Sequence, residues 1–396
     1  MNKKLWEEKK TSLGNAIIIG VVLAVFGVVI GANWNNIFSG FAPYLGFTSN
    51  TSNVDWSSLN EVYNKLASSY NGEINEKDII EGAKKGIAAA LGDVYTVYMS
   101  PEVSTDFYND LHGNVGSGIG VEMGLRDGYV RVLRTLPDNP AKKAGILAGD
   151  IIYKVDGEEV WSLSSEEISK RVRGESGTEV EITVVRDGKE KTFKMKREEI
   201  NNVSAYVDYD GKTAIVTVTR FDTDTGTKVQ AFANEFAGKG INKVILDLRN
   251  NGGGYVSAAQ DLLSLWLDNQ KILEQKSKHY GNNTTNSYSG RAILKDMKTI
   301  VLVNGSTASA SEIVAGALQD YGKATILGEK TFGKGVVQNL FDLSGGSTLK
   351  VTTAEWYTPN DRSINKEGIT PDIEVTRSYE DINSMRDPQL DKAKAL

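Results

Sequence analysis

The sequence contains no cysteine and only two histidines among its 396 residues. Without cysteine there are no disulfides, no thiolate nucleophile and no cysteine-ligated metal cluster. The two histidines, His112 and His279, do not form a metal-binding spacing such as His-Glu-x-x-His, which disfavours zinc hydrolases and most histidine-based triads. We therefore expect neither a metal nor a cofactor, and a catalytic nucleophile would need a base other than histidine.

The chain also lacks a long block of basic residues, and its formal net charge is −6. A phosphate backbone is bound by clustered lysine and arginine, so nucleic acid is not an expected partner. With 40% hydrophobic and 24% charged residues, the composition is that of a folded globular protein. The length allows two or three domains.

The N-terminal region contains a long apolar stretch. No charged residue occurs from Thr11 to Val54, and residues 13–32 provide the ~20 apolar positions that a membrane-spanning helix requires. Four lysines precede this stretch and no basic residue follows it until Lys65. The positive-inside rule then predicts a cytoplasmic N-terminus (1–12), a single-pass signal anchor in the cell membrane (13–32), a linker (33–54) and an extracytoplasmic catalytic part.

Two other interpretations of the apolar stretch remain open. It can be a cleaved signal peptide, because it has a basic leader and ends in small residues, although it is longer than the usual apolar region of such peptides. It can also be a buried helix of a soluble core, but the segment after it reads as a polar spacer containing Gly, Ser and Thr. An uncleaved anchor is the interpretation that the length favours.

Two regions of different character follow the linker. Residues 55–112 are predicted to be helical, because apolar residues recur with helical spacing from Leu59 to Leu66 and again from Ile79 to Leu91. Residues 113–200 form a predicted compact module of five or six strands and two helices. One hairpin should turn at Asp187-Gly188, and one helix should start with a capping box at Ser164.

Residues 201–380 alternate short β-branched runs with amphipathic helices, a pattern typical of β-α-β units with a largely parallel sheet. Ligand sites in such sheets lie beyond the carboxyl ends of the strands. Those ends carry the sequences NNGGG (250–254) and NGSTASAS (304–311). The last segment, 381–396, is charged and is predicted to be a short surface helix or tail.

Ser309 is a candidate nucleophile because it lies at the start of a predicted helix. Free N–H groups and the positive end of the helix dipole stabilise a negatively charged oxygen there, and the amide of Ala310 is a natural oxyanion donor. The alternative is that Ser309 only caps the helix, because serine and threonine are common throughout this turn.

A neutral lysine can replace histidine as the base that activates a serine. Lys334 lies between Gly333 and Gly335, which allow close backbone approach, and apolar residues follow it. Burial of this kind lowers the pKa of a lysine. Gln338, four residues further on, could orient the amine with its amide oxygen. The alternative is a solvated loop lysine.

Two glycine-rich turns are candidate binding elements. Gly252 to Gly254 free the backbone to turn N–H groups toward a ligand, so a second oxyanion donor could come from this turn. Gly118, Ile119, Gly120 and Val121 have the composition of a loop whose amides hold the terminal carboxylate of a peptide that adds as an extra strand. Ordinary tight turns are the competing interpretation for both.

Six sequence motifs together resemble the carboxyl-terminal processing peptidases, also called tail-specific proteases. The resemblance runs from about Asp55 to the C-terminus. The motifs stand in the order that this family has, and they are LGDVYTVYMSPE, GSGIGVEM with GILAGDIIYKVDGEEV, LDLRNNGGG, VNGSTASASEIVAGALQD, TFGKGVVQ and TTAEWYTPNDRSINKEGITPDIEV.

The resemblance implies an α/β fold with a crotonase-like (Clp-protease-like) serine protease core, an inserted PDZ domain and an N-terminal helical region. It implies that Ser309 is the nucleophile, Lys334 the general base and Gln338 the residue that positions the lysine. Ala310 and Gly253 would form the oxyanion hole. The PDZ domain would bind the C-terminal tails of protein or peptide substrates, which the core would cleave through an acyl-enzyme.

Two other classes of protein remain as alternatives. One is a membrane-anchored scaffold that binds peptides through its PDZ module over an inactive core, although a scaffold has no need of the serine, lysine and glutamine together. The other is a crotonase-like lyase acting on thioesters, which would need neither the PDZ module nor the lysine. The physiological substrate and the oligomeric state are left open, with a homodimer among the possibilities.

Overall fold

The computed structural model describes residues 55–114, 116–126, 128–384 and 386–396. Residues up to Glu76 form one unit, and residues from Lys77 onward form a second. The predicted anchor and linker lie outside the described residues. Within the ranges given, no helix is both long enough and apolar enough to cross a bilayer.

The first unit contains the predicted helix near residue 60, observed as α3 (Ser57–Ser69). Its apolar residues Leu59, Val62 and Leu66 are all exposed, and none of its residues is buried against the part of the chain that the structure describes. The helical prediction is confirmed. Because nothing described covers its apolar side, however, its amphipathic pattern does not correspond to a buried face here.

The second unit begins with two further helices separated by a short strand. They are α4 (Glu76–Ala89), β1 (Val97–Met99) and α5 (Pro101–His112). The helical prediction for residues 55–112 did not include β1. This strand pairs antiparallel with β18, some 250 residues later in the chain, a partner that local periodicity does not reveal. The buried Tyr98 of β1 donates its hydroxyl to Glu81 of α4 at 2.8 Å.

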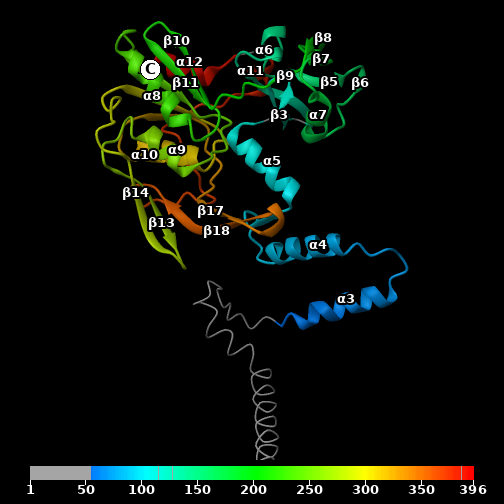
Figure 1. The fold of residues 1–396 in the computed structure, drawn as a ribbon. Helices are drawn as coiled ribbons and strands as arrows, with labels where there is room; N and C mark the ends of the chain where they lie inside the picture. The colour runs from blue at the N-terminus through cyan, green and yellow to red at the C-terminus, as the bar shows by residue number, and fades with distance from the viewer. Residues whose placement is uncertain (1–54, 115, 127, 385) are drawn as a thin grey trace, which may run out of the picture. The chain divides into compact units, whose positions relative to one another are not determined.

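The predicted β-rich module, labelled by α6 and α7 in Figure 1, is present. It contains an antiparallel sheet with strand order β3-β4-β5-β7-β8, in which β6 also pairs with β5. The strands of this sheet are β3 (Val121–Arg126), β4 (Tyr129–Thr135), β5 (Ile151–Val155), β6 (Glu158–Glu159), β7 (Glu179–Arg186) and β8 (Lys189–Lys196). The short strands β2 (Ser117–Gly118) and β9 (Glu198–Glu199) pair with each other, so the module has more strands than the five or six predicted. Its two helices are α6 (Pro140–Ala144) and α7 (Ser165–Val172). Positive φ angles at Asp187 (52°) and Gly188 (71°) form the predicted hairpin turn. The capping box at Ser164 is also present.

A six-stranded sheet has the order β10-β11-β12-β15-β16-β19, and all neighbours except β10 and β11 run parallel, as the alternating pattern predicted. Its strands are β10 (Ala205–Asp210), β11 (Thr213–Val218), β12 (Lys243–Asp247), β15 (Lys298–Val303), β16 (Thr325–Gly328) and β19 (Ile373–Glu374). Three helices pack their apolar residues on one face of this sheet, namely α8 (Thr225–Phe236), α9 (Val256–Leu263) and α10 (Ala310–Asp320).

A second sheet of the core has the order β1-β18-β13-β14, with β17 also paired to β18. Its remaining strands are β13 (Lys271–Ser277), β14 (Gly281–Asn286), β17 (Val336–Asp342) and β18 (Thr348–Tyr357), and the short 3-10 helix η2 (Ser344–Gly346) joins the last two. Trp356 of β18 is buried in the same hydrophobic cluster as α9 and α10. This sheet therefore packs on the same core as the parallel sheet and supplies β17, which follows Lys334.

The C-terminal segment forms α11 (Tyr379–Asn383) and α12 (Pro388–Ala395). A helix was predicted here, but α12 is more than a surface element. Ala393 is fully buried and packs with Leu302 and Leu327 on the sheet face opposite α8 to α10, and Gln389 is almost fully buried. The charged residues of the tail hide this role, because only one face of the short helix is apolar.

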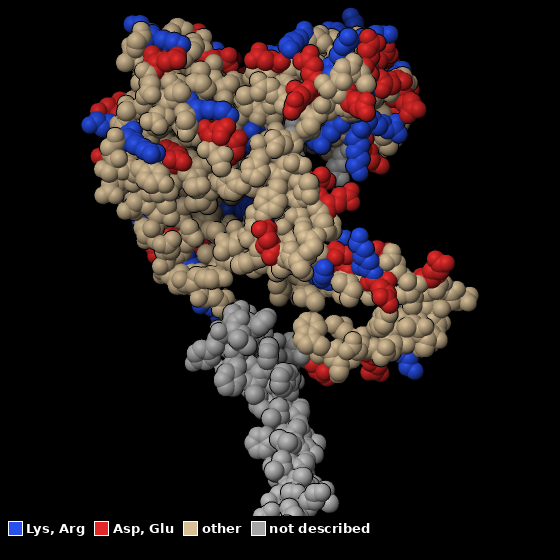
Figure 2. Space-filling view, viewed as in Figure 1, with Lys and Arg blue, Asp and Glu red and all other residues tan. Residues whose placement is uncertain are grey.

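Acidic and basic side chains are interspersed on the face of the molecule shown in Figure 2. Many of the ion pairs join exposed residues, such as Lys143 with Glu198 and Arg171 with Glu158. Exposed pairs of this kind contribute about 0–1 kcal/mol each. The stability of the second unit must therefore come mainly from its buried apolar clusters.

Candidate active site

Ser309 occupies the turn between β15 and α10, at the N-cap position of the helix. Its backbone has φ 57° and ψ −119°, a conformation that residues with a Cβ rarely adopt. Such strain costs on the order of 1–3 kcal/mol and persists only where the surroundings hold it. The predicted strand, turn and helix are all present, and the turn lifts Ser309 out of the helical path.

Glu312 holds this turn in place. Its fully buried carboxylate accepts hydrogen bonds from the N–H groups of Ser309 (2.8 Å), Gly333 (2.7 Å) and Lys334 (2.9 Å) and from the hydroxyl of Thr331 (2.6 Å). One carboxylate thus joins the backbone of the candidate nucleophile to that of the candidate base. Reasoning from the sequence did not single out Glu312.

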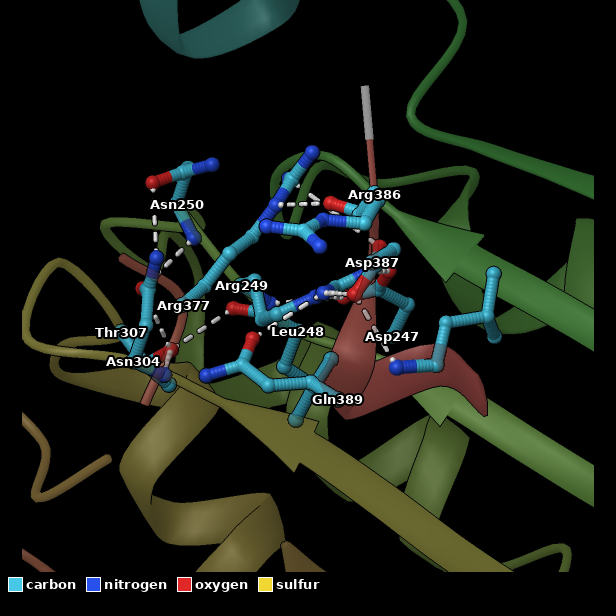
Figure 3. A network of polar contacts seen from close by, with 11 residues as sticks. Asp247, Leu248, Arg249, Asn250, Asn304, Thr307, Arg377, Arg386, Asp387 and Gln389 are labelled. Carbon is cyan, nitrogen blue, oxygen red and sulfur yellow. Dashed lines mark hydrogen bonds and ion pairs between the residues drawn. The ribbon is translucent and has the colours of Figure 1, made fainter. Parts of the chain in front are cut away.

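A second group of contacts joins the turn after β12 to the turn after β15 (Figure 3). Asn304 donates its amide N–H to the Asn250 side chain at 2.9 Å, and the Asn250 backbone N–H donates to Asn304 Oδ1 at 2.9 Å. Thr307 donates its hydroxyl to the Leu248 carbonyl at 2.9 Å. The two loops that sequence patterns placed at the carboxyl ends of the strands are thereby fixed to each other.

The neighbouring Arg249 links these loops to the C-terminal segment (Figure 3). Its guanidinium donates to both oxygens of Asp247 (2.9 and 2.6 Å), to Asp387 (2.8 Å) and to Gln389 (3.0 Å). Burial disfavours its charged form, but the two carboxylates outweigh burial and raise the pKa of Arg249. The segment that contains α12 is therefore tied to the loop that carries the glycine turn.

Gly253 lies directly against the candidate nucleophile. A Cβ at this position would be 2.8 Å from the Ser309 Cβ and 3.0 Å from the Ala310 nitrogen, so only glycine fits. In this structure the Gly253 N–H donates to Asn251 Oδ1 at 2.9 Å. The Ala310 N–H belongs to the first residue of α10 and has no acceptor within the helix.

Lys334 precedes β17 in a segment that passes close to other backbone. A Cβ at Gly333 would be 3.0 Å from the Gly368 nitrogen, which explains one of the flanking glycines. The Lys334 Nζ lies 5.3 Å from the ring centroid of Tyr95. Burial, followed by the charge of Lys350, lowers the pKa of Lys334, while Glu312 opposes the shift. The amine is thus biased toward the neutral form that a general base requires.

Ser309, Lys334, Gln338 and Gly253 all line one pocket of about 640 Å³. No hydrogen bond joins the side chains of Ser309 and Lys334 among the described residues, and the Gln338 Nε2 is buried without a partner there. The rest of the lining is largely apolar and includes no acidic residue. Three segments far apart in the sequence therefore meet at one pocket with basic and hydrophobic walls.

The predicted peptide-binding residues line a different pocket, of about 460 Å³, together with Ser169 and Val172 of α7. Gly118, Ile119 and Gly120 are buried, and Gly120 has φ 76°. A side chain at Gly120 would collide with Asn139. The loop thus lies at the open end of a groove between β3 and α7, where a peptide strand could be added.

Within the described residues no group of three or more acidic or histidine side chains is arranged to hold a metal ion. The main residues that sequence reasoning missed are Glu312, Asn251 and Tyr95. Glu312 had a signal, because Ser309-x-x-Glu312 has the spacing of a capping box. The sequence gives no comparable signal for Asn251 or Tyr95. Asn251 accepts from the Gly253 N–H only in the folded conformation of the turn, and Lys334, the partner of Tyr95, is distant in the sequence.

Comparisons with known proteins agree with these features region by region. Residues 212–375 match the model of peptidase family S41, residues 117–196 match a PDZ domain, and residues 46–103 match the N-terminal domain of the activating protease CtpB. A probable CtpA-like serine protease of Staphylococcus aureus (strain MRSA252) is 34% identical over 96% of this chain and 75% of its own length. A Staphylococcus saprophyticus protein of the same description is 32% identical, over 93% and 73%.

Solved structures also match. A photosystem II D1 C-terminal processing protease is 28% identical, covers 84% of this chain and 90% of its own, and gives a TM-score of 0.57. A putative S41 protease from Bacteroides fragilis, 16% identical over 87% and 97% of the two chains, gives the same TM-score and supports the fold alone.

The α/β core and its matches define this protein as a serine peptidase with a PDZ domain and an N-terminal helical domain. The chain belongs to peptidase family S41, as a CtpA-like C-terminal processing protease. The sequence-based predictions of fold and enzyme class are confirmed.

Proposed function

We propose that this peptidase is an endopeptidase that cleaves by an acyl-enzyme mechanism with a Ser309–Lys334 dyad. Neutral Lys334 takes the Ser309 proton as Oγ attacks the substrate carbonyl. The same proton then goes to the departing amine, and water hydrolyses the ester. The observation that carries the proposal is that Ser309 lines one pocket together with Lys334 and Gln338, which come from a separate segment.

The oxyanion hole in this proposal uses the N–H groups of Ala310 and Gly253. The Ala310 N–H stands at the positive end of α10, which favours a developing negative charge. The Gly253 N–H donates to Asn251 in the present structure, so the peptide between Gly252 and Gly253 must rotate before it can serve. Glycine on both sides of this peptide makes the rotation inexpensive. Gln338 would orient the Lys334 amine during the reaction.

The proposed substrates are proteins or peptides bound by their C-terminal tails. The tail would add as a strand beside β3, with its carboxylate at the loop of Gly118, Ile119, Gly120 and Val121. The groove between β3 and α7 supports this placement. Neither nucleic acid nor a metal has a role in the proposed reaction.

We further propose that the chain is anchored in the cell membrane by residues 13–32, with the peptidase outside the cytoplasm. The apolar length and the preceding lysines support this location. Carbonate extraction should leave the full chain in the membrane fraction, and protease added to spheroplasts should digest it. Release of a shortened chain into the medium would contradict an uncleaved anchor.

A homodimer is also proposed, since α3 exposes its apolar side, and light scattering of the full chain in detergent tests it.

Two substitutions test the mechanism. Ser309→Ala should reduce hydrolysis of β-casein to background. Lys334→Arg should reduce it by at least ~10³-fold, because arginine stays protonated and cannot accept the serine proton. Lys330→Arg, an exposed lysine four residues earlier, is the matched control and should keep full activity. Substantial turnover by folded Lys334→Arg would refute the dyad. Casein binding without hydrolysis by the unaltered protein would favour the scaffold interpretation.

A further inference from the structure

Arg220 connects the end of β11 to the glycine turn beside Ser309. The next residue, Phe221, donates its N–H to the Gly253 carbonyl at 2.9 Å and accepts the N–H of Tyr255 at 2.8 Å. These two bonds fix the main chain of Arg220 next to the turn. The position of its guanidinium is therefore coupled to the wall of the catalytic pocket.

The guanidinium of Arg220 has unused hydrogen-bonding capacity. Its Nη2 donates to Asp222 Oδ2 at 2.8 Å, whereas its Nε and Nη1 are buried and have no partner among the described residues. The side chain as a whole is 16% exposed. Leaving a buried donor without an acceptor is unfavourable, so these two groups favour any ligand that brings acceptors to them.

The location of Arg220 identifies the ligand. Arg220 and Gly252 line both the catalytic pocket and the pocket that contains the loop from Gly118 to Val121. A polypeptide whose tail occupies the groove must pass between these pockets to reach Ser309. Asp222 already neutralises the charge of Arg220, so the remaining donors suit neutral carbonyl oxygens better than carboxylates.

We propose that Arg220 is a substrate-binding residue that donates hydrogen bonds to main-chain carbonyls of the substrate between its docked tail and the scissile bond. This inference rests on the proposed function, because it assumes that one polypeptide occupies both pockets. Because every residue carries a main-chain carbonyl, these contacts would not depend on the side chains of the substrate.

Kinetics of β-casein hydrolysis test the inference through the split between KM and kcat. Arg220→Gln should raise KM about tenfold, the loss expected for hydrogen bonds from a charged donor, while kcat changes less than about threefold. Arg220→Lys should recover part of the loss, because it keeps the charge but offers fewer directed donors. Arg291→Gln, another arginine paired with a single aspartate but lining neither pocket, is the matched control.

A binding measurement separates this inference from the dyad. In the Ser309→Ala background, the Kd of fluorescein-labelled β-casein should rise about tenfold with Arg220→Gln, whatever the chemistry of cleavage. If Arg220→Gln fails to fold, Gly113→Ala replaces it, since a Cβ there would displace the Arg220 Nη2. Unchanged Kd and KM in folded variants would overturn the role of Arg220. Hydrolysis that persists in Ser309→Ala would instead overturn the dyad.

Discussion

Glu312 and Asp387 are two carboxylates beside the catalytic turns, and they differ in how their charges are balanced. Among the described residues, Glu312 accepts from backbone N–H groups and one hydroxyl, and no cation there is bonded to its negative charge. Asp387 is paired with Arg249 at 2.8 Å. Because Glu312 bonds the backbone of Ser309 and Lys334, we expect it to affect the proposed dyad, whereas Asp387 should act mainly on stability.

Of the substitutions that probe this comparison, Glu312→Gln should have the largest effect. Glu312 Oε2 accepts from the N–H groups of Ser309 and Lys334, so an amide NH₂ in place of this oxygen would face two N–H donors and lose both bonds. At ~1.5–3 kcal/mol per bond to a charged acceptor, the loss is about 3–6 kcal/mol. We expect a clearly lower Tm and a fall in kcat of at least ~10²-fold, because Ser309 and Lys334 both lose a backbone anchor.

Calorimetry and β-casein turnover measure the two effects of Glu312→Gln separately. Glu367→Gln is the matched control, because that glutamate is exposed in a neighbouring loop, and it should be neutral in both measurements. A variant that melts early but keeps its kcat at low temperature would show that Glu312 only stabilises the fold. Glu312 and Asp387 would then both act on stability alone.

A smaller, purely structural effect is expected for Asp387→Asn. Arg249 keeps Asp247, and the contacts between Asn250 and Asn304 do not involve Asp387. We expect a loss of about 1–3 kcal/mol in the free energy of unfolding at neutral pH, with kcat nearly unchanged. Urea denaturation followed by far-ultraviolet circular dichroism gives the stability, and casein turnover gives kcat. A large fall in kcat would mean that the C-terminal segment also positions the catalytic turn.

The pH dependence of this difference has a definite sign. Burial raises the pKa of Asp387, but the hydrogen bond and charge of Arg249 outweigh burial, so its pKa in the folded protein is below the ordinary value. Its contribution is therefore present above the pKa of an unfolded aspartate, ~3.9, and is lost as pH falls through the folded pKa. The stability gap between the unaltered protein and Asp387→Asn should shrink in acid.

The fold was largely predictable because its elements carry strong local signals. The parallel strands are short β-branched runs followed by amphipathic helices, and the hairpin at Asp187-Gly188 has its turn residues in sequence. What the sequence did not predict depends on distant partners. Strand β1 exists because β18 lies beside it, and α12 covers the sheet through a single apolar face that includes Ala393.

The candidate site was predictable where residue type limits the chemistry. A chain with two histidines has few possible general bases, and the glycines on both sides of Lys334 indicate that this lysine lies close to other backbone. The residues that hold the site in place were harder to predict from the sequence. Glu312 reads as a helix cap, and only the folded chain brings its carboxylate to Gly333 and Lys334. Asn251 and Arg220 could not be singled out from the sequence. Asn251 is identified by the hydrogen bond that it accepts from Gly253, and Arg220 by two guanidinium donors without a partner among the described residues.

The smallest effect expected here compares the two charges that act on Lys334. Lys350 lowers the pKa of Lys334 and Glu312 raises it, both less strongly than burial does. Lys350→Met removes the repulsion, so the pKa of Lys334 should rise and the acid limb of the kcat/KM profile should move to higher pH, because less of the base is neutral at a given pH. Lys350→Arg keeps the positive charge and should leave the limb in place. If Lys350→Met and Lys350→Arg give the same profile, Lys350 does not act through its charge, and burial alone with Glu312 sets the protonation of the base.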